Sequence, residues 1–213
     1  MKNIHWLGSG LSSIPGIRRL ASNNYNLTVW NRTLSKAQKS IDHVKTDKVS
    51  AKTLNIDTIA ENIEQGDIIV SQLTANMHLD IAKICLEKKC HFITTSYLTP
   101  EIKKLNEQTV AHNLIFINEV GLDPGIDHFF SHLLVQELKS LNLNNLSVSY
   151  KSYCGGIPAV PNDFKYKFSW SPVGVIKALN SPAKFTQNFE EKLVPQPYKE
   201  VKNHLINSES FEA

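Results

Sequence analysis

Cysteine and methionine are scarce in this sequence, which has three cysteines and two methionines among 213 residues. An odd number of cysteines with no C-x-x-C pair argues against a disulfide framework and against a zinc ribbon. The first apolar run is only four residues long, too short for the core of a secretory signal peptide. These absences lead us to expect a protein of the reducing cytoplasm.

Long apolar stretches and an excess of one charge are also missing. No segment approaches the roughly 18 apolar residues of a membrane-spanning helix, so we expect no membrane partner. The formal net charge is only +3, and lysine and arginine are scattered, so we expect no nucleic-acid partner. Hydrophobic residues make up 41% of the chain, which is enough for a globular protein with a core.

Short apolar runs alternate with amphipathic segments over the first 120 residues. The runs predict strands over residues 4–7, 27–30, 49–54, 67–71, 91–94 and 114–117. The segments between them predict helices over residues 14–20, 35–41, 57–65 with Asp57 as cap, 76–88, and from Pro100 with Thr99 as N-cap. This alternation is typical of a doubly wound parallel sheet covered on both faces. We therefore predict an α/β fold with a Rossmann-like, doubly wound domain over residues 1–122, whose NAD(P)-binding character rests on the motifs that follow.

The pattern changes after Val120. A turn cluster at 121–125 precedes a predicted helix over 126–141, and residues 146–153 and 166–170 alternate like half-exposed strands. Beyond Asn188 the chain is polar and broken by prolines, and residues 207–213 have no evident partner. We predict the beginning of a second, α+β domain over residues 123–213, with exposed apolar side chains at Ile157, Phe168 and Trp170.

A glycine-containing turn follows the first predicted strand. Its residues are Gly8, Ser9, Gly10, Leu11 and Ser12. Backbone N–H groups at such a turn, together with the helix N-terminus, suit a pyrophosphate. Ser13 stands where the dinucleotide fingerprint has its third glycine, so the motif is incomplete. The alternative is an ordinary turn between strand and helix, but the place after the first strand favours dinucleotide binding.

The end of the second predicted strand carries Asn31, Arg32 and Thr33. A carboxylate at this point would hold the ribose 2′-hydroxyl of NAD. Here an arginine could bind a 2′-phosphate through two hydrogen bonds, which favours NADP over NAD. The alternative is an ordinary surface arginine.

Polar residues follow three further predicted strands. They are Leu73-Thr74, Thr95-Ser96-Tyr97, and the stretch from Asn118 to Asp123. Ligands of open α/β sheets bind at the carboxyl ends of the strands, so we expect these residues to line one crevice. The alternative is the general polarity of loops.

Three other features are weaker. An isolated cysteine such as Cys154 is by default structural, although Gly155 and Gly156 beside it would allow a ligand to approach closely. His128 and His132 have metal-ligand spacing on the predicted helix, but no third ligand is evident, and we expect no metal. Tyr198 and Lys202 form a Y-x-x-x-K pair outside the predicted sheet, which indicates a chance match.

Several stretches together resemble one known family, the saccharopine dehydrogenases of the L-glutamate-forming type, also called saccharopine reductases. The matching stretches are residues 7–10 with Pro15, 31–33, 94–100, 118–128, 152–158 and 166–171. The most specific are N-E-V-G-L-D-P-G-I-D-H at 118–128 and S-Y-C-G-G-I-P at 152–158.

The resemblance implies NADP-dependent oxidation at the CH–NH bond of saccharopine, or the reverse reduction, in lysine metabolism and amino-acid biosynthesis. It also implies a nucleotide domain joined to a substrate and dimerisation domain, and a homodimer. The family's substrate positions map onto Ser96, Tyr97, Asp123, Cys154 and Gly155. Its cofactor positions map onto Gly8, Ser9, Gly10, Leu11, Ser12, Asn31, Arg32, Thr33, Leu73, Thr74, Thr95 and Ser96. Of these, Asp123 is the candidate acid/base, Tyr97 would orient substrate, and Cys154 would shape the pocket.

Two departures from the family pattern keep alternatives open. Val173 stands where saccharopine reductases usually carry an arginine, and family chains are much longer. This chain would then end inside its second domain, and a second chain could supply the missing part. The alternatives are a related amine or imine dehydrogenase of the lysine or carboxynorspermidine type, and a non-catalytic cofactor-binding fragment.

Overall fold

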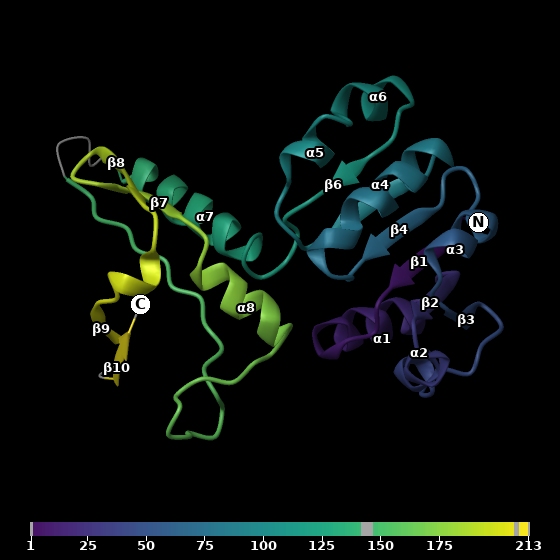
Figure 1. The fold of residues 1–213 in the computed structure, drawn as a ribbon, viewed down its shortest axis with the longest axis horizontal. Helices are drawn as coiled ribbons and strands as arrows, with labels where there is room; N and C mark the ends of the chain where they lie inside the picture. The colour runs from purple at the N-terminus through teal and green to yellow at the C-terminus, as the bar shows by residue number, and fades with distance from the viewer. Residues whose placement is uncertain (1, 142–146, 207–208, 213) are drawn as a thin grey trace. The chain divides into compact units, whose positions relative to one another are not determined.

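The computed structural model describes residues 2–141, 147–206 and 209–212. The chain divides into two compact units, Met1–Gly155 and Gly156–Ala213. Each unit has its own secondary structure (Figure 1).

A six-stranded parallel sheet in the order β3-β2-β1-β4-β5-β6 organises the first unit (Figure 1). Its strands are β1 (Ile4–Leu7), β2 (Leu27–Asn31), β3 (Val49–Thr53), β4 (Ile68–Ser71), β5 (His91–Thr94) and β6 (Phe116–Ile117). The order reverses between β1 and β4, whose register pairs Leu7 with Ser71. This point of reversal is where a doubly wound sheet opens a crevice at its carboxyl edge.

Helices cover both faces of this sheet. They are α1 (Ile14–Ser22), α2 (Leu34–Ile41), α3 (Ile56–Asn62), α4 (His78–Glu87), α5 (Pro100–Lys103) and α6 (Asn106–Ala111), with short 3-10 turns at Leu11–Ser13 and Ala75–Met77. Two separate buried clusters show the two faces, because α1 and α2 pack on one and α3, α4 and α5 on the other. The predicted doubly wound fold is confirmed.

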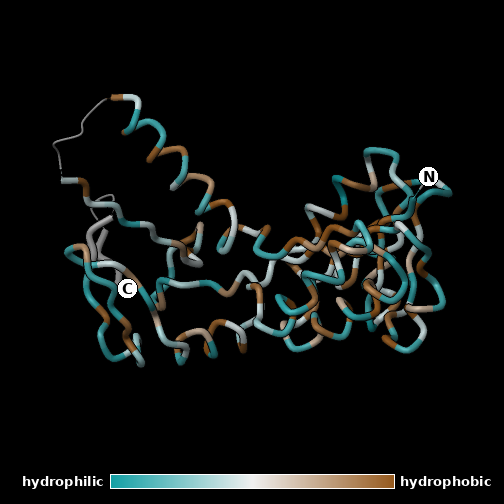
Figure 2. The backbone as a smooth tube through the Cα atoms, turned by 90° about the horizontal axis from the view of Figure 1, so that it is seen from above, coloured by the Kyte–Doolittle hydropathy of each residue, from teal (hydrophilic) through white to brown (hydrophobic). Residues whose placement is uncertain are grey.

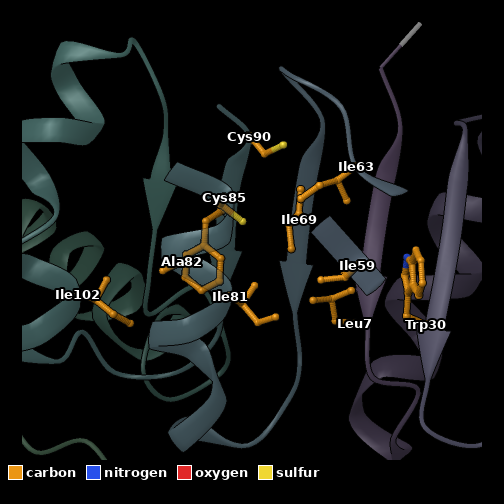
Figure 3. Close-up of a cluster of buried hydrophobic side chains, with 11 residues drawn as sticks. Leu7, Trp30, Ile59, Ile63, Ile69, Ile81, Ala82, Cys85, Cys90 and Ile102 are labelled. Atoms are coloured by element: carbon orange, nitrogen blue, oxygen red, sulfur yellow. The ribbon is translucent and has the colours of Figure 1, made fainter. Parts of the chain in front are cut away.

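The larger cluster runs across the sheet from Trp30 on β2, past Leu7 and Ile69, to Ile81 on α4 and Ile102 on α5 (Figure 3). In Figure 2 the tube of this unit alternates between apolar, brown segments and polar, teal ones. This core holds the carboxyl ends of the strands in fixed positions, which a binding site on the loops requires.

Element bounds differ from the sequence prediction by a few residues at several places, of which three are informative. The cap of α3 is Asn55, whose side chain accepts a hydrogen bond from the backbone N–H of Asp57, and Asp57 itself lies inside the helix. The predicted helix from Pro100 is two short helices, although Thr99 caps the first as expected. Strand β6 begins at Phe116 instead of residue 114, and at this start the Ile115 N–H donates to the His91 ring.

Helix α7 (Ile126–Ser140) lies where the sequence predicts a helix. The strand predicted over 146–153 is wrong for residues 147–153, which have no strand pairing, while Leu146 lies outside the described residues. The alternation of apolar side chains was real, but a strand also needs a neighbour to complete its ladder of backbone hydrogen bonds. Figure 2 shows apolar and polar turns alternating along α7, where Phe129, Phe130 and Leu133 are exposed.

The second unit contains helix α8 (Pro172–Leu179) and two antiparallel hairpins, β7 (Ala183–Gln187) with β8 (Glu190–Val194), and β9 (Asn203–Ile206) with β10 (Glu209–Glu212). The first hairpin turns on Asn188 and Phe189, both at positive φ, as a two-residue turn of matching twist requires. The strand predicted over 166–170 is absent: in this stretch the Lys167 N–H donates to the Gly156 carbonyl, but no ladder forms.

The carboxyl-terminal part of the chain is more ordered than the sequence indicates. Residues 209–212 pair with β9, so the expectation that 207–213 lack a partner is wrong for these four, while residues 207, 208 and 213 lie outside the described residues. The predicted exposure of apolar side chains is confirmed, since Ile157, Phe168 and Trp170 expose 61%, 37% and 52% of their surface.

Candidate cofactor and substrate site

The turn between β1 and α1 passes close to the end of β4. Gly8 has φ +97°, and a Cβ placed there would lie 2.9 Å from the carbonyl oxygen of Gln72. A side chain is therefore excluded both by conformation and by contact with backbone. At Gly10 a Cβ would meet no atom within 4 Å, so the backbone of this residue faces open space. The two glycines thus have the separate properties that a pyrophosphate-binding turn needs.

The packing function of the third glycine of the fingerprint is performed three residues later. Ser13 is buried at 2% exposure, and α1 approaches the sheet at Gly16, where a Cβ would lie 2.6 Å from the Trp6 ring. Close contact between helix and strand is the role of the third glycine in dinucleotide-binding turns. The incomplete motif therefore does not weaken the interpretation of this turn.

Asn31 joins the β1 turn to the end of β2. Its side-chain amide donates to the Ser9 hydroxyl at 2.7 Å, and its oxygen accepts from the Thr33 N–H at 2.9 Å. The Arg32 side chain between them is exposed and makes no hydrogen bond or ion pair with any residue that the structure describes. A cationic group at the end of β2 is therefore available to a phosphate.

A buried histidine that the sequence analysis overlooked connects the ends of β4 and β5. His78, the first residue of α4, is 2% exposed and lies 3.0 Å from the Ser71 hydroxyl through Nδ1 and 2.8 Å from the Ser96 hydroxyl through Nε2. Thr94 also lies 3.3 Å from Nε2. Burial lowers the pKa of His78 to about 4, so the ring is neutral at physiological pH.

Tyr97, Asp123 and Cys154 lie together. The Tyr97 hydroxyl donates to an Asp123 carboxylate oxygen at 3.4 Å, and Cys154 makes a side-chain hydrogen bond with the same carboxylate. Partial burial raises the pKa of Tyr97, and the negative charge of Asp123 adds to the increase. The same two causes, in the same order, raise the pKa of the Cys154 thiol. Residues from three distant parts of the sequence thus meet at one carboxylate.

A tightly packed loop places Asp123. Gly125 has φ +146°, and a Cβ there would lie 2.4 Å from the Gly121 carbonyl oxygen. The Asp123–Pro124 peptide bond is cis, and the Gly121 N–H donates to the Pro124 carbonyl at 2.9 Å. Glu119 ties the loop to the segment after β5, because its carboxylate accepts from the Leu98 N–H at 3.0 Å.

Two family models match the chain. Residues 4–117 match the saccharopine dehydrogenase NADP binding domain, and residues 121–213 match the saccharopine dehydrogenase C-terminal domain. The chain belongs to the saccharopine dehydrogenase family. The resemblance seen in the sequence is therefore confirmed.

Related proteins of the saccharopine dehydrogenase family are longer than this chain. It is 35% identical to saccharopine dehydrogenase [NADP(+), L-glutamate-forming] of Schizosaccharomyces pombe over 88% of its own length and 42% of the relative. It is 34% identical to mitochondrial alpha-aminoadipic semialdehyde synthase of Rattus norvegicus over 88% of this chain and 20% of that one. The apo saccharopine dehydrogenase (L-Glu forming) of Saccharomyces cerevisiae superposes with a TM-score of 0.76 at 29% identity, covering all of this chain and 49% of the other.

The remaining predicted site residues lie in the loops after β1, β4 and β5, with Gly155 beside Cys154. The Thr95 hydroxyl donates to the Gln72 side chain at 3.3 Å, which joins the ends of β5 and β4. Leu73 packs against the core, while Thr74, Leu11 and Ser12 are exposed. Gly155, beside Cys154, has open space where a Cβ would be.

Metal and membrane features can be checked over the same residues. In the described part of the chain no group of three or more histidine, cysteine or acidic residues could hold a metal ion; His128 pairs only with Asp127, at 3.6 Å. No helix in residues 2–141, 147–206 or 209–212 is long and apolar enough to cross a membrane.

We predict that one thiol of the folded chain reacts with iodoacetamide. Cys154 is exposed, whereas Cys85 and Cys90 are buried, and burial raises the pKa of both. Replacing Asp123 by asparagine removes a negative charge that disfavours the Cys154 thiolate, so Cys154 should react several-fold faster at pH 8. Mass spectrometry of timed samples measures both. An unchanged rate in Asp123→Asn would show that the carboxylate does not act on this thiol.

Proposed function

We propose that the chain binds NADP and belongs to an oxidoreductase acting on the CH–NH bond of saccharopine. In that reaction saccharopine, NADP⁺ and water give glutamate, 2-aminoadipate semialdehyde, NADPH and a proton, or the reaction runs in reverse. The observation that carries the proposal is the meeting of Tyr97, Cys154 and Asp123 in one cluster. Ser96, which precedes Tyr97 in the segment after β5, contacts His78 and would link this cluster to the bound cofactor.

The residues present fit a dinucleotide. Backbone at Gly10 faces open space for the pyrophosphate, and Asn31 fixes the turn through Ser9. Arg32 is available to the 2′-phosphate. The cofactor, when bound, supplies the hydride chemistry, and the protein supplies position and field.

The cluster around Asp123 suits the amine end of the substrate. A carboxylate can accept a hydrogen bond from a secondary ammonium group and can take up or return its proton. Tyr97 keeps its proton because its pKa is raised, so its hydroxyl can exchange the long bond to Asp123 for one to a substrate oxygen. Cys154 also stays a neutral thiol, because its pKa is raised, and would line the substrate pocket. The open space at Gly155 leaves room for a substrate carboxylate.

Replacing Arg32 by alanine should weaken NADPH binding about tenfold or more and leave NADH binding nearly unchanged, because only NADPH carries the 2′-phosphate. Arg19→Ala is the matched control: it removes the same charge from the last turn of α1 and should leave the ratio of the two affinities as in the wild type. Fluorescence titration of each nucleotide measures the dissociation constants. An equal loss for NADPH and NADH in Arg32→Ala would contradict the 2′-phosphate role.

Turnover tests the substrate. NADPH oxidation is followed with glutamate and 2-aminoadipate semialdehyde, and then with other amine and carbonyl pairs. Val173, 63% exposed on α8, occupies the position where the family usually has an arginine, so turnover with another pair would favour a related amine or imine dehydrogenase. NADPH binding with no turnover on any pair would favour a cofactor-binding fragment.

We also propose a cytoplasmic protein that pairs with a second copy or with a complementary chain. The three free cysteines suit a reducing compartment. Exposed Phe129, Phe130 and Leu133 on α7 form an apolar surface of the kind that subunits bury. Sedimentation velocity, with and without a candidate complementary chain, measures the association.

A further inference from the structure

We propose that His78 is a positioning residue that fixes the hydroxyl of Ser96 for the bound nucleotide. The proposal rests on the proposed NADP-binding function and assigns a role to a residue outside the glycine turn, the Arg32 site and the Asp123 cluster. It starts from the chain of contacts that runs from β4 through α4 to the segment after β5.

The imidazole of His78 is held between two hydroxyl groups, one at the end of β4 and one in the segment after β5. Ser71, the last residue of β4, is fully buried and contacts Nδ1 at 3.0 Å. Ser96 is partly buried and contacts Nε2 at 2.8 Å. The ring therefore links the end of β4 to the segment after β5. Strand β4 borders β1 at the reversal of strand order.

The Ser96 side chain is held through its hydroxyl and its own backbone. The Ser96 N–H donates to the Thr94 hydroxyl at 3.2 Å, and that hydroxyl lies 3.3 Å from Nε2 of His78. Thr94 is 1% exposed, so water does not compete for this contact. These contacts restrain the Ser96 hydroxyl, and a preoriented group binds a ligand at a smaller entropy cost.

A neutral ring suits this role. Imidazole in its neutral form has one donor and one acceptor nitrogen, so it can bond Ser71 through Nδ1 and a hydroxyl at Nε2, where Ser96 is nearer than Thr94. An apolar side chain of the same volume would leave the buried Ser71 and Thr94 hydroxyls without the partner they have now. His78 also packs edge-on against Phe92, with 6.3 Å between ring centroids, so its plane is fixed.

Two amide substitutions separate the two ends of the ring. Asparagine places its amide near the position of Nδ1 and can keep the contact with Ser71. Glutamine reaches the position of Nε2 and can keep the contact with Ser96. A purely structural link between β4 and α4 needs the Ser71 contact, whereas the proposed role needs the Ser96 contact.

The test measures NADPH affinity by fluorescence and thermal stability for the wild type, His78→Gln and His78→Asn. We expect His78→Gln to bind NADPH within about threefold of the wild type and His78→Asn about tenfold more weakly, the size of one lost hydrogen bond. In a chain that already carries Ser96→Ala, adding His78→Asn should cause no further loss of NADPH affinity, because both changes remove the same contact. Equal affinities in the two amide variants, or a full additional loss in the double variant, would overturn the proposal.

NMR of the His78 ring nitrogens separates this outcome from failure of NADP binding itself. Absence of NADPH binding in the wild type would overturn the proposed function. The His78–Ser96 contact would then be tested in the nucleotide-free chain with Ser96→Ala. This change should shift the resonance of Nε2 and leave that of Nδ1 nearly in place. A ring that does not respond to Ser96→Ala would overturn the positioning role irrespective of the cofactor.

Discussion

Replacing Gly125 by alanine is expected to cost about 2–6 kcal/mol in unfolding free energy, the sum of backbone strain and overpacking. A Cβ there would lie 2.4 Å from the Gly121 carbonyl oxygen, 2.7 Å from the Gly121 nitrogen and 2.8 Å from the Glu119 carbonyl oxygen. All three are backbone atoms, so no side chain can rotate away. The φ of +146° adds strain in any residue with a side chain. Chemical denaturation measures the loss.

The change should also reach the site, because the Gly125 loop carries Asp123. A displaced carboxylate would leave Tyr97 and Cys154, so Cys154 should react faster with iodoacetamide, as in Asp123→Asn. Gly155→Ala is the matched control, since a Cβ there meets nothing within 4 Å, and its stability should stay within about 0.5 kcal/mol of the wild type. If Gly125→Ala is as stable as Gly155→Ala, the described loop conformation is wrong.

The first unit was predictable from sequence because its local signals and its topology agree. Apolar runs such as residues 67–71 are too short for helices, and the segments between them have helical periodicity. Right-handed connections then leave few arrangements for six parallel strands. The errors lie at element ends, such as the cap of α3, where a single side-chain hydrogen bond from Asn55 decides the boundary.

The second unit was less predictable, because strand pairing depends on partners far apart in space. The alternating stretch at 166–170 has the right pattern but no ladder. The hairpin at Asn188 and Phe189 lacks the Asn-Gly signal that marks such turns, yet both residues take positive φ.

The site divides in the same way. Loops after strands could be placed at one edge of the sheet, where Tyr97 contacts Asp123. His78 could not be found by this rule, because it begins a helix and is buried. Its one signal was a histidine among the apolar residues that open α4, and in a single sequence that pattern equally fits an ordinary core residue.

Acidification should destabilise the chain through His78 well before the carboxylates protonate. The pKa of this ring is about 4 in the folded chain and 6.5 in the unfolded chain. Between these two pH values the unfolded chain therefore binds a proton that the folded chain does not. Stability from this group is therefore complete above pH 6.5 and is lost as the pH falls toward 4. At 1.36 kcal/mol per unit, the loss is about 2 kcal/mol at pH 5. Urea denaturation at pH 7 and pH 5 measures it.

Both amide variants of His78 lack the titrating ring, so each should lose about 2 kcal/mol less than the wild type between pH 7 and pH 5. His5, whose pKa burial also lowers despite the nearby Asp67, remains in all three proteins and contributes equally to each. The two amide variants should therefore show the same reduced pH dependence of stability but different NADPH affinities. This separates the charge state of His78 from its contact with Ser96. Equal pH dependence in the wild type and both variants would mean that the ring is reached by water and is not held neutral by burial.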